Sequence, residues 1–578
     1  MTTITVTFPS GTTLTVPSGT AAASLLDNFK ETPASIYAVL ANNEVYSLSS
    51  PLLCDVSLEP VLAASKYGAE VYRRSLCFLL AAAAHTLFPS SRLLVGHSLG
   101  YGYYYTLDTG KRIKQSDIDK LKKEMASLVE QNLPLETSHI AYREAIALFE
   151  KLGLVETRKQ LDCICPPAIK INTLLDFSDM YFGPLVLSTG YLRVFDLMAY
   201  GEGFLLRFPT SSKPQELPEF HDIPALFNIY KKYKEWGKQI GITSAASLNE
   251  LVKNRQTKDL IDITETFQIK CIADIADQIH DRSQVKVVLM AGPSSSGKTT
   301  TSKKLALQLQ AIGYKPKVIS LDNYYVGRDK TPKDENGDYD YECLEALDVP
   351  LLNQILIDLF DGKEVQMPSY SFAKGERYYD GTTMKLDSHD ILIMEGIHGL
   401  NDKLTPLIKP EYKFKIYLSA LTQLNLDDHN RISTSDNRLI RRIVRDAQFR
   451  GKSAADTIAM WDNVQKGERL HIFRSRITQT QCSTLRLITN LPCSKYMRNR
   501  CCAVYLRCRK NMRKHQGCSD SWATFLRYLL QQCLTVLSSA SLSAEAHSTT
   551  ENAKAGWVDP LCTDQSGLFI YTIEEFYH

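Results

Sequence analysis

The stretch V-V-L-M-A-G-P-S-S-S-G-K-T-T, residues 287–300, decides the fold of the second half of this chain. Residues 287–290 form an apolar run that is typical of a buried parallel strand. Residues 292–299 fit the pattern G-x-x-x-x-G-K-[ST], and residues 300–312 carry leucine and alanine at helical spacing. A strand, a glycine-rich loop and a helix in this order predict a loop whose backbone N–H groups surround phosphate oxygens.

The loop predicts the residues that bind the donor nucleotide, which we expect to be ATP or GTP. These residues are consecutive: Gly292, Pro293, Ser294, Ser295, Ser296, Gly297, Lys298, Thr299 and Thr300. We expect Lys298 to reach the β- and γ-phosphates, and the hydroxyl of Thr299 to hold Mg²⁺. A chance glycine turn is the alternative, but the strand before the loop and the helix after it favour a nucleotide site.

Two acidic residues follow further apolar runs and are candidates for catalysis. Strands and helices alternate after residue 287, which predicts a parallel sheet covered on both faces. Residues 318–321 form a strand that ends at Asp322, and residues 391–396 contain a strand that ends at Glu395. Acids at the carboxyl ends of such strands face the reaction crevice. Asp322 could accept the proton of an attacking hydroxyl, and Glu395 could hold Mg²⁺; either could merely cap a helix.

Five motifs in order make residues 285–473 resemble the uridine kinase/phosphoribulokinase family. They are G-P-S-S-S-G-K-T-T, L-D-N-Y-Y, Y-D-Y-E (339–342), P-S-Y-S-F (368–372) and R-L-I-R-R-I-V-R-D (438–446). The resemblance implies an α/β P-loop kinase that transfers a phosphoryl group to an alcohol. It also implies Asp322 as the general base and Asp340 as a ligand of the ribose hydroxyls.

The resemblance also implies residues for the acceptor and for the transferred charge. Tyr370 and Phe372 would line a nucleobase pocket, with Tyr325 and Arg377 beside them. Guanidinium groups on one helix would form a lid over the phosphates; they belong to Arg438, Arg441, Arg442 and Arg445. Among these Arg442 is the catalytic candidate, whereas Arg438 and Arg445 are candidates for substrate binding. A solvated basic helix is the alternative.

One position departs from the pyrimidine kinases of this family. They place a histidine three residues beyond the aromatic pair, where this chain has Gly375 between Lys374 and Glu376. Uridine or cytidine is the expected acceptor, and another small ribose-containing or phosphorylated acceptor stays open. The product would be a nucleoside 5′-monophosphate.

The N-terminal half resembles parts of threonyl-tRNA synthetases. Residues 4–16 predict a hairpin, and F-P-S-G-T-T-L-T-V-P-S-G-T (8–20) resembles the TGS domain, a β-grasp module. S-L-C-F-L-L-A-A-A-A-H-T-L-F (75–88), G-H-S-L-G-Y-G-Y-Y-Y (96–105) and D-M-Y-F-G-P-L-V-L-S-T-G (179–190) resemble the synthetase's α+β editing domain. Residues 226–241 resemble the amphipathic helix that follows it.

The editing centre of that family uses histidines and a cysteine, and this chain lacks them. Arg74, Phe78, Tyr181 and Leu185 occupy those places. Without imidazole or thiolate there is neither a metal ligand nor a proton carrier, so we expect a retained fold without editing chemistry. A nucleic-acid partner is therefore a candidate that no retained editing residue supports, and ligand sensing or homo-oligomerisation are further candidate roles.

These resemblances divide the chain into five segments: a TGS-like domain (1–64), an editing-like domain (65–220), a helical linker (221–282), the kinase domain (283–473) and an aberrant tail (474–578). The resemblance to kinases is expected to stop after Phe473. Between 474 and 546 there are twelve Lys or Arg and two acids, and eight of the 14 cysteines follow residue 473.

Two hypotheses explain the tail: a basic, cysteine-rich metal or nucleic-acid segment, or a shifted reading frame. Codons can be chosen for residues 478–491 that spell the family's T-D-T-M-F-N-S-A-L-D-Y-E-L two nucleotides later. A DNA read across codons 465–485 distinguishes the two. A frame-shifted tail would replace core surface of the kinase domain, so we expect poor solubility or low stability.

Bulk composition narrows the setting. The net charge of +3 over 578 residues says little about partners. No signal peptide or membrane-spanning run is visible, and the six cysteines before residue 474 suggest a reducing compartment, so we expect a cytoplasmic protein without a membrane partner. A nucleotide-dependent tRNA-binding or regulatory protein is the second functional hypothesis.

Overall fold

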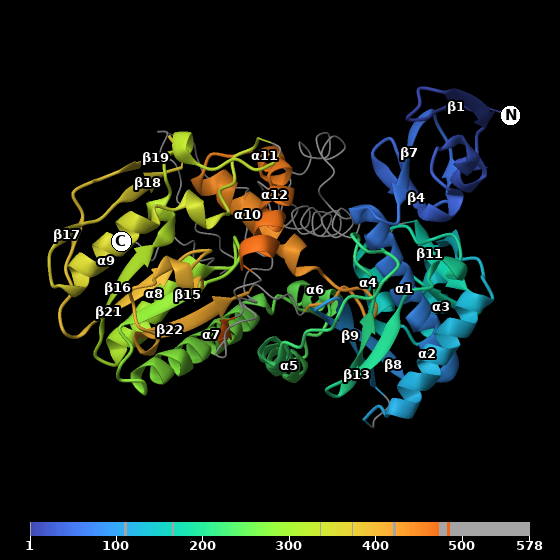
Figure 1. The fold of residues 1–578 in the computed structure, drawn as a ribbon. Helices are drawn as coiled ribbons and strands as arrows, with labels where there is room; N and C mark the ends of the chain where they lie inside the picture. The colour runs from blue at the N-terminus through green and yellow to red at the C-terminus, as the bar shows by residue number, and fades with distance from the viewer. Residues whose placement is uncertain are drawn as a thin grey trace, which may run out of the picture.

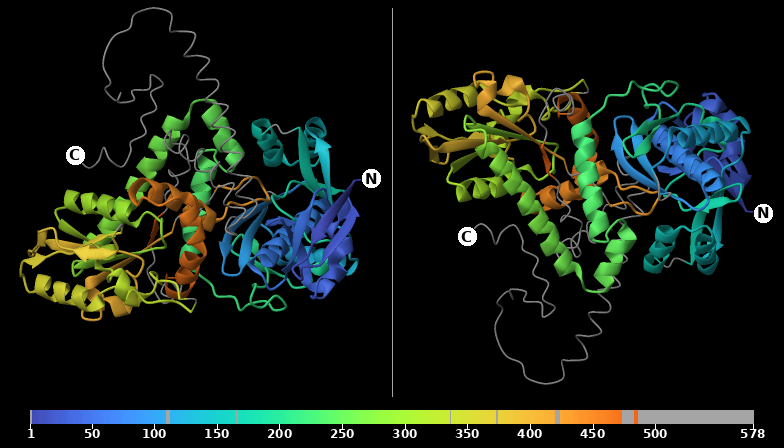
Figure 2. Two further views of the ribbon diagram at one scale, coloured as in Figure 1. Left: turned by 90° about the horizontal axis from the view of Figure 1, so that it is seen from above. Right: turned by 90° about the horizontal axis from the view of Figure 1, so that it is seen from below.

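The computed structural model describes residues 2–108, 112–164, 167–335, 337–372, 374–419, 424–472 and 483–485. Figure 1 shows two halves, with the N-terminal domains on the right and the kinase domain on the left. Three helices, shown in green in Figure 2, lie between them: α5 (Pro224–Gln239), α6 (Ala245–Lys253) and α7 (Thr257–His280). No helix within the described ranges is long and apolar enough to cross a membrane.

The first domain is a five-stranded sheet with the order β2-β1-β7-β4-β5. Its strands are β1 (Thr3–Thr7), β2 (Thr13–Pro17), β4 (Ile36–Ala41), β5 (Glu44–Tyr46) and β7 (Val56–Leu62), with a short 3₁₀ helix at Ala22–Asn28. β1 and β2 form the predicted hairpin, while β1 pairs in parallel with β7. This arrangement is the predicted β-grasp fold.

The second domain combines two sheets with long helices, which makes it α+β as predicted. One sheet has the order β13-β14-β9-β8 and the other has the order β10-β11-β12. The strands are β8 (Arg92–Leu99), β9 (Gly102–Asp108), β10 (Glu136–Ala141), β11 (Ala168–Leu174), β12 (Phe177–Asp179), β13 (Asp196–Tyr200) and β14 (Gly203–Arg207). The helices are α1 (Lys66–Leu87), α2 (Gln115–Glu130), α3 (Tyr142–Lys151) and α4 (Val155–Ile164). The apolar run of α1 is fully buried in their common core.

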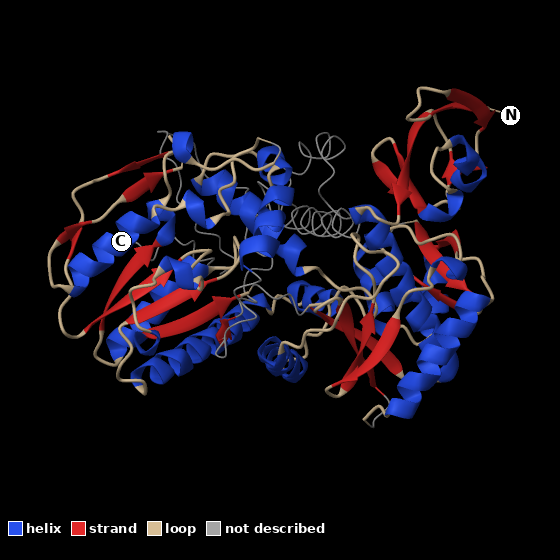
Figure 3. Ribbon diagram, viewed as in Figure 1, coloured by secondary structure: helices blue, strands red, loops and turns tan. Residues whose placement is uncertain are grey.

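The kinase domain is built on a parallel sheet with the order β16-β21-β15-β22-β23. These strands are β15 (Val287–Ala291), β16 (Lys315–Ser320), β21 (Asp390–Glu395), β22 (Lys413–Leu418) and β23 (Ser483–Leu485). Figure 3 shows them as neighbouring red arrows.

Helices cover both faces of this sheet. Successive residues of β15 point to opposite sides, so they contact different helices. Val287 and Leu289 pack with α9 (Val349–Phe360). Val288 and Met290 pack with α7 and with α8 (Lys298–Ala311). The predicted α/β kinase fold is confirmed.

The fifth strand of this sheet, β23, belongs to the tail that sequence analysis considered aberrant. Ser483 lies opposite Ile416 of β22, and the pairing continues to Leu485. A backbone ladder needs no particular side chains, so this pairing does not decide between the two hypotheses for the tail. Apart from residues 483–485, the tail from 474 lies outside the described residues.

Candidate active site

The phosphate loop lies between β15 and α8, as predicted. Lys298 and Thr299 are the first two residues of α8, and Gly297 precedes them with φ +96°. Gly292 has no room for a side chain, because a Cβ there would lie 2.3 Å from the carbonyl oxygen of Leu418. Glycine is thus required at both ends of the loop, by close packing at one and by backbone conformation at the other.

Thr299 and Glu395 come together at the carboxyl edge of the sheet. The Thr299 hydroxyl donates to Glu395 Oε1 at 2.8 Å, and the Ser320 hydroxyl donates to the same oxygen at 3.0 Å. Burial raises the pKa of Glu395, although the charge of Lys298 lowers it in part. A hydroxyl and a carboxylate with oxygen ligands suit Mg²⁺, so this pair fits the predicted metal role.

Lys298 is half-buried and bonds to its own loop. Its Nζ donates to the carbonyl oxygens of Gly292 (2.9 Å) and Pro293 (3.3 Å). Burial lowers the pKa of Lys298, while the charges of Glu395 and Asp322 oppose that shift. The hydroxyl oxygens of Ser295 and Ser296 are buried without a hydrogen-bond partner among the described residues. An ammonium group and unpartnered hydroxyl oxygens in one loop fit an anionic ligand such as a nucleoside triphosphate.

The arginines of the predicted lid lie against this loop. They are on α10 (Thr434–Phe449). Arg438 Nε donates to the Ser294 carbonyl and Arg441 Nε donates to the Ser295 carbonyl, both at 2.9 Å. Arg442 Nη1 donates to the Ser294 hydroxyl at 3.1 Å. The structure therefore brings the helix and the loop together.

Their partners differ in a way the sequence did not show. Arg438 also forms a buried ion pair with Glu468, with Nη1 and Oε2 2.9 Å apart, and stacks over Trp461. Arg445 bonds to Asp446 at 2.8 Å. Burial and its neighbours Arg438 and Arg445 lower the pKa of Arg441 to about 10. Arg438 and Arg442 thus each combine an ion pair with a bond to the phosphate loop: Arg438 pairs with Glu468, and Arg442 pairs with Asp446.

Asp322 stands in a 3₁₀ turn directly after β16, at the edge where Glu395 ends β21. Asp322 forms a long ion pair with Arg450, whose Nη2 lies 3.7 Å from Asp322 Oδ2. The guanidinium of Arg450 also lies 4.2 Å from the centre of the Phe372 ring. Arg450 therefore links the candidate base to the aromatic residues.

The aromatic residues form a cluster beside Asp322. The Tyr325 ring lies 5.7 Å from Tyr370 and 6.4 Å from Phe372, and Tyr370 lies 5.3 Å from Phe372. Tyr370 and Phe372 come from the hairpin of β18 (Ser369–Ser371) and β19 (Glu376–Tyr378). Phe372 is 40% exposed, so part of its ring is accessible to a ligand.

Two other acceptor residues have different partners. Arg377 pairs with Asp348 at 2.9 Å, and Asp340 accepts the backbone N–H of Glu342 at 3.0 Å. Their predicted contacts with an acceptor stay predictions. Gly375 has φ +74°, and a Cβ there would lie 3.0 Å from Arg328 Nε, so a histidine could not replace it without strain.

Glu342 is a site residue that sequence analysis missed, although it lies in the quoted motif Y-D-Y-E. Its Oε2 is buried without a hydrogen-bond partner among the described residues. Burial raises the pKa of Glu342 to about 7, while the charges of Arg442 and Lys298 lower it in part. The sequence offered two acids two positions apart and no means of choosing between them.

We expect Glu342→Gln to stabilise the ligand-free protein at pH 8 relative to the parent. The folded pKa of Glu342 is raised, so its contribution to stability is full below the unfolded pKa near 4.5 and is lost as the pH rises to about 7. The loss amounts to at most ~3 kcal/mol. Thermal unfolding at pH 5 and pH 8 measures it; an equal pH dependence in both proteins would contradict the assignment.

Comparison with known proteins relates the two halves of the chain to different families. Residues 287–491 match the model of the phosphoribulokinase/uridine kinase family. The match runs past Phe473, so the expectation that the resemblance stops there is wrong: β23 continues the kinase sheet.

The N-terminal part is similar to threonine–tRNA ligases. The enzyme of Carboxydothermus hydrogenoformans is 34% identical over 133 residues, which are 23% of this chain and 21% of that one. The enzyme of Geobacter sp. is 28% identical over 202 residues, which are 34% and 31% of the two chains. The chain thus spans only about a fifth to a third of the length of these relatives.

A solved structure described as a possible uridine kinase from Bacillus stearothermophilus is 23% identical, over 26% of this chain and 81% of that one. Its TM-score of 0.22 is too low to support an argument. The family match and the site geometry together support an ATP-dependent kinase of a small molecule. Residues 287–491 therefore match the phosphoribulokinase/uridine kinase family, the described part of this range has a P-loop kinase fold, and the N-terminal region is similar to threonine–tRNA ligases.

Proposed function

We propose that this protein transfers the γ-phosphoryl group of ATP or GTP to the 5′-hydroxyl of a nucleoside, most favourably uridine or cytidine. The observation that carries this proposal is the place of Asp322, between the phosphate loop and the aromatic cluster. Asp322 follows β16 at the edge where Glu395 ends β21, and the Arg450 guanidinium lies near both the Asp322 carboxylate and the Phe372 ring. A nucleoside stacked on Tyr370 and Phe372 could thus present a hydroxyl to Asp322.

In this reaction the nucleoside 5′-oxygen attacks the γ-phosphorus. Asp322 accepts the hydroxyl proton as the new P–O bond forms, and the bond from the γ-phosphorus to the bridging oxygen breaks, leaving ADP or GDP. Lys298 and Arg442 stabilise negative charge on the phosphoryl group and the leaving oxygen. Mg²⁺ bound by Thr299 and Glu395 would neutralise further phosphate charge.

A panel of acceptors tests the proposal. The full-length protein is incubated with Mg²⁺, ATP or GTP, and uridine, cytidine, adenosine, guanosine or a sugar phosphate, and 5′-monophosphates are quantified. Turnover of the pyrimidine nucleosides is expected. Turnover of a sugar phosphate alone would replace the nucleoside as acceptor. Nucleotide hydrolysis that depends on tRNA, without acceptor phosphorylation, would favour the tRNA-binding or regulatory hypothesis.

We expect Tyr370→Ala to raise the KM for the nucleoside about 10-fold or more, because base–aromatic stacking contributes ~1–3 kcal/mol per base. The effect on kcat should be smaller, since Tyr370 takes no part in the bonds that form and break. Tyr378→Ala is the matched control, because Tyr378 is 47% exposed on the same hairpin and lies outside the aromatic cluster. Equal effects of both substitutions would argue against a stacking role.

The proposal extends to the compartment, the metal and the binding partners of the protein. We propose a cytoplasmic protein that uses Mg²⁺ and binds a nucleoside. A nucleic-acid partner and a homo-oligomer are the candidate associations of the N-terminal half. Size-exclusion chromatography with light scattering and a tRNA-binding titration test the two associations.

A further inference from the structure

A segment of the kinase domain lies inside the N-terminal half. Residues 424–432, here called the hook, follow β22 in the chain and precede α10; they read L-N-L-D-D-H-N-R-I. In Figures 1 and 2 the orange chain reaches from the kinase half to the blue and teal strands. Leu426, Asp427, Asp428 and His429 are all buried. Four successive residues of a loop, three of them with polar side chains, are thus shielded from solvent where the loop meets another domain.

The hook is a tight turn that its own residues stabilise. The Leu426 N–H donates to the Asn430 carbonyl at 2.8 Å. One carboxylate oxygen of Asp427 accepts the backbone N–H groups of His429 (2.9 Å) and Asn430 (2.7 Å). The turn therefore enters the other domain with a defined shape.

Hydrogen bonds from the backbone and from one side chain join the hook to the edge strand β8 and to the start of α6. The Val95 N–H donates to the Asp428 carbonyl at 2.8 Å, and the Asn425 side chain donates to the Val95 carbonyl at 2.6 Å. The Ala245 N–H donates to the Asn425 carbonyl at 2.8 Å. Arg92 adds a two-pronged ion pair with the Asp428 carboxylate, at 2.8 and 3.1 Å.

The tip of the hook meets residues beside the former editing positions. His429 Nδ1 lies 2.6 Å from Asp179 Oδ2, and both side chains are buried. The Asn430 side chain donates to the Met180 carbonyl at 2.8 Å. Asp179 and Met180 immediately precede Tyr181, which stands where the synthetase family has its cysteine.

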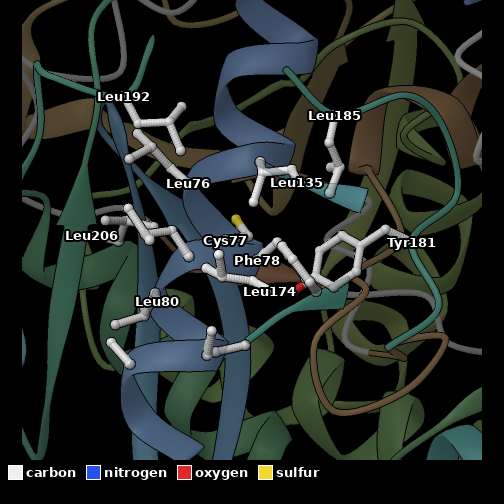
Figure 4. Packing of buried hydrophobic residues seen from close by; sticks show 14 of the residues in the cluster. Leu76, Cys77, Phe78, Leu80, Leu135, Leu174, Tyr181, Leu185, Leu192 and Leu206 are labelled. Atoms are coloured by element: carbon white, nitrogen blue, oxygen red, sulfur yellow. The ribbon is translucent and has the colours of Figure 1, made fainter. Parts of the chain in front are cut away.

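The former editing positions are themselves filled by packing. The Phe78 and Tyr181 rings are 5.2 Å apart at a steep angle, and Leu185 is buried beside them. Figure 4 shows Phe78, Tyr181 and Leu185 converging from α1 and from the chain after β12. Arg74 donates to the Pro184 carbonyl at 2.9 Å. Buried side chains therefore occupy these positions, next to the residues that the hook contacts.

The hook leads directly into the lid helix. Ser433 caps α10, and Arg438, which bonds to the phosphate loop, follows His429 by nine positions. With the hook fixed, the start of α10 has little freedom to move away from the N-terminal half. A ligand or partner that displaces the N-terminal half would consequently displace the lid.

We propose that the N-terminal half positions the lid of the kinase by holding the hook, and that Asp179 and His429 are positioning residues. The kinase thus uses the remnant of a synthetase-like domain as an anchor for its own catalytic helix. This proposal requires nucleotide binding at the phosphate loop but is independent of the acceptor.

The buried charges around His429 support a pH-sensitive contact. Burial lowers the pKa of His429, but the hydrogen bond and charge of Asp179, with Asp428 and Asp427, raise it overall. Burial, then Asp179, raises the pKa of Asp427 to about 8. Both raised pKa values favour docking at lower pH and lose their contribution as the pH rises, that of Asp427 through about 8. The charged and titratable groups that face the hook are Arg92, Glu156, Asp179, Tyr181 and Lys234.

Hydrogen exchange of the full-length protein tests the proposal. In His429→Ala we expect exchange at least ~10-fold faster in residues 424–432 and in the first turns of α10, because one partner of a buried pair is lost. Exchange in β15 should be unchanged. The KM for ATP should rise while the hook is loosened, and binding of a non-hydrolysable ATP analogue should weaken equally, whichever acceptor the enzyme uses.

Three companion variants make the result specific. Asp179→Asn keeps the shape of the side chain and should give the same pattern at smaller size; it carries the test if His429→Ala does not fold. The double variant should be less than additive, because the two residues act as one contact. Lys66→Ala is the matched control: it breaks an exposed ion pair with Asp462 between the same two halves and should leave α10 unchanged.

Two results would overturn the proposal. Faster exchange in the hook with unchanged exchange in α10 and unchanged KM for ATP would show that the N-terminal half is merely tethered. Unchanged exchange in the hook of His429→Ala would show that this contact does not hold it. Failure of acceptor phosphorylation with these exchange changes present would count against the proposed function and not against the anchor.

Discussion

Asp322→Asn should lower kcat about 10²–10⁴-fold while leaving the fold and nucleotide binding intact. The amide has nearly the shape of the carboxylate but cannot accept the hydroxyl proton of the acceptor. The Asp322 side chain is 39% exposed and forms a long ion pair with Arg450 at 3.7 Å, so the carboxylate should contribute little to the stability of the fold. Steady-state kinetics with the preferred acceptor, together with thermal unfolding, measure both parts of the prediction.

Asp361→Asn is a suitable control for the lost charge. Asp361 is an exposed residue at the end of α9, outside the site, and its substitution should leave kcat unchanged. Activity of Asp322→Asn near that of the parent would remove Asp322 as the base, and Glu342 would then be the acid to test.

Lys298→Ala should lower kcat/KM for ATP about 10²–10³-fold, because one stabilising charge is removed from the transferred phosphoryl group. In the ligand-free protein Lys298 bonds two carbonyls of its own loop, and burial lowers its pKa. Removing a partly desolvated ammonium should therefore offset the loss of these two bonds, and the substitution should preserve or raise the melting temperature. Kinetics at saturating acceptor and thermal unfolding without nucleotide measure the two effects.

Lys303→Ala controls for charge on the same helix. Lys303 is exposed on α8, five positions beyond Lys298. A loss of activity in Lys303→Ala that matched the loss in Lys298→Ala would indicate a general electrostatic effect on nucleotide binding. It would contradict a specific role for Lys298.

The phosphate site could be predicted from the sequence because its residues are close together in the chain. Strand, loop and helix fix Lys298 and Thr299 locally, and a parallel sheet brings Glu395 to the same edge by a general rule. The resemblance to the kinase family supplied α10 and the aromatic cluster. The structure places all of these within one site, although it leaves Arg377 and Asp340 with other partners.

The hook could not be predicted, because its partners are distant in the chain. Asp427, Asp428 and His429 have the composition of a solvated loop, and nothing in them indicates burial. Asp179 is 250 positions away from His429. Only the arrangement of the two halves turns a polar loop into a buried contact, and a single sequence carries no record of that pairing.

Close packing at Gly292 gives the site a shared support. Because a Cβ at Gly292 would strike the carbonyl of Leu418, the phosphate loop rests directly on the last residue of β22. The same strand continues in the chain toward the hook. The strand that supports the phosphate loop is therefore also the strand that precedes the hook and α10 in the chain. A movement of α10 that begins beyond Leu418 would leave the contact between Gly292 and Leu418 intact, so opening the site need not loosen the loop beneath the nucleotide.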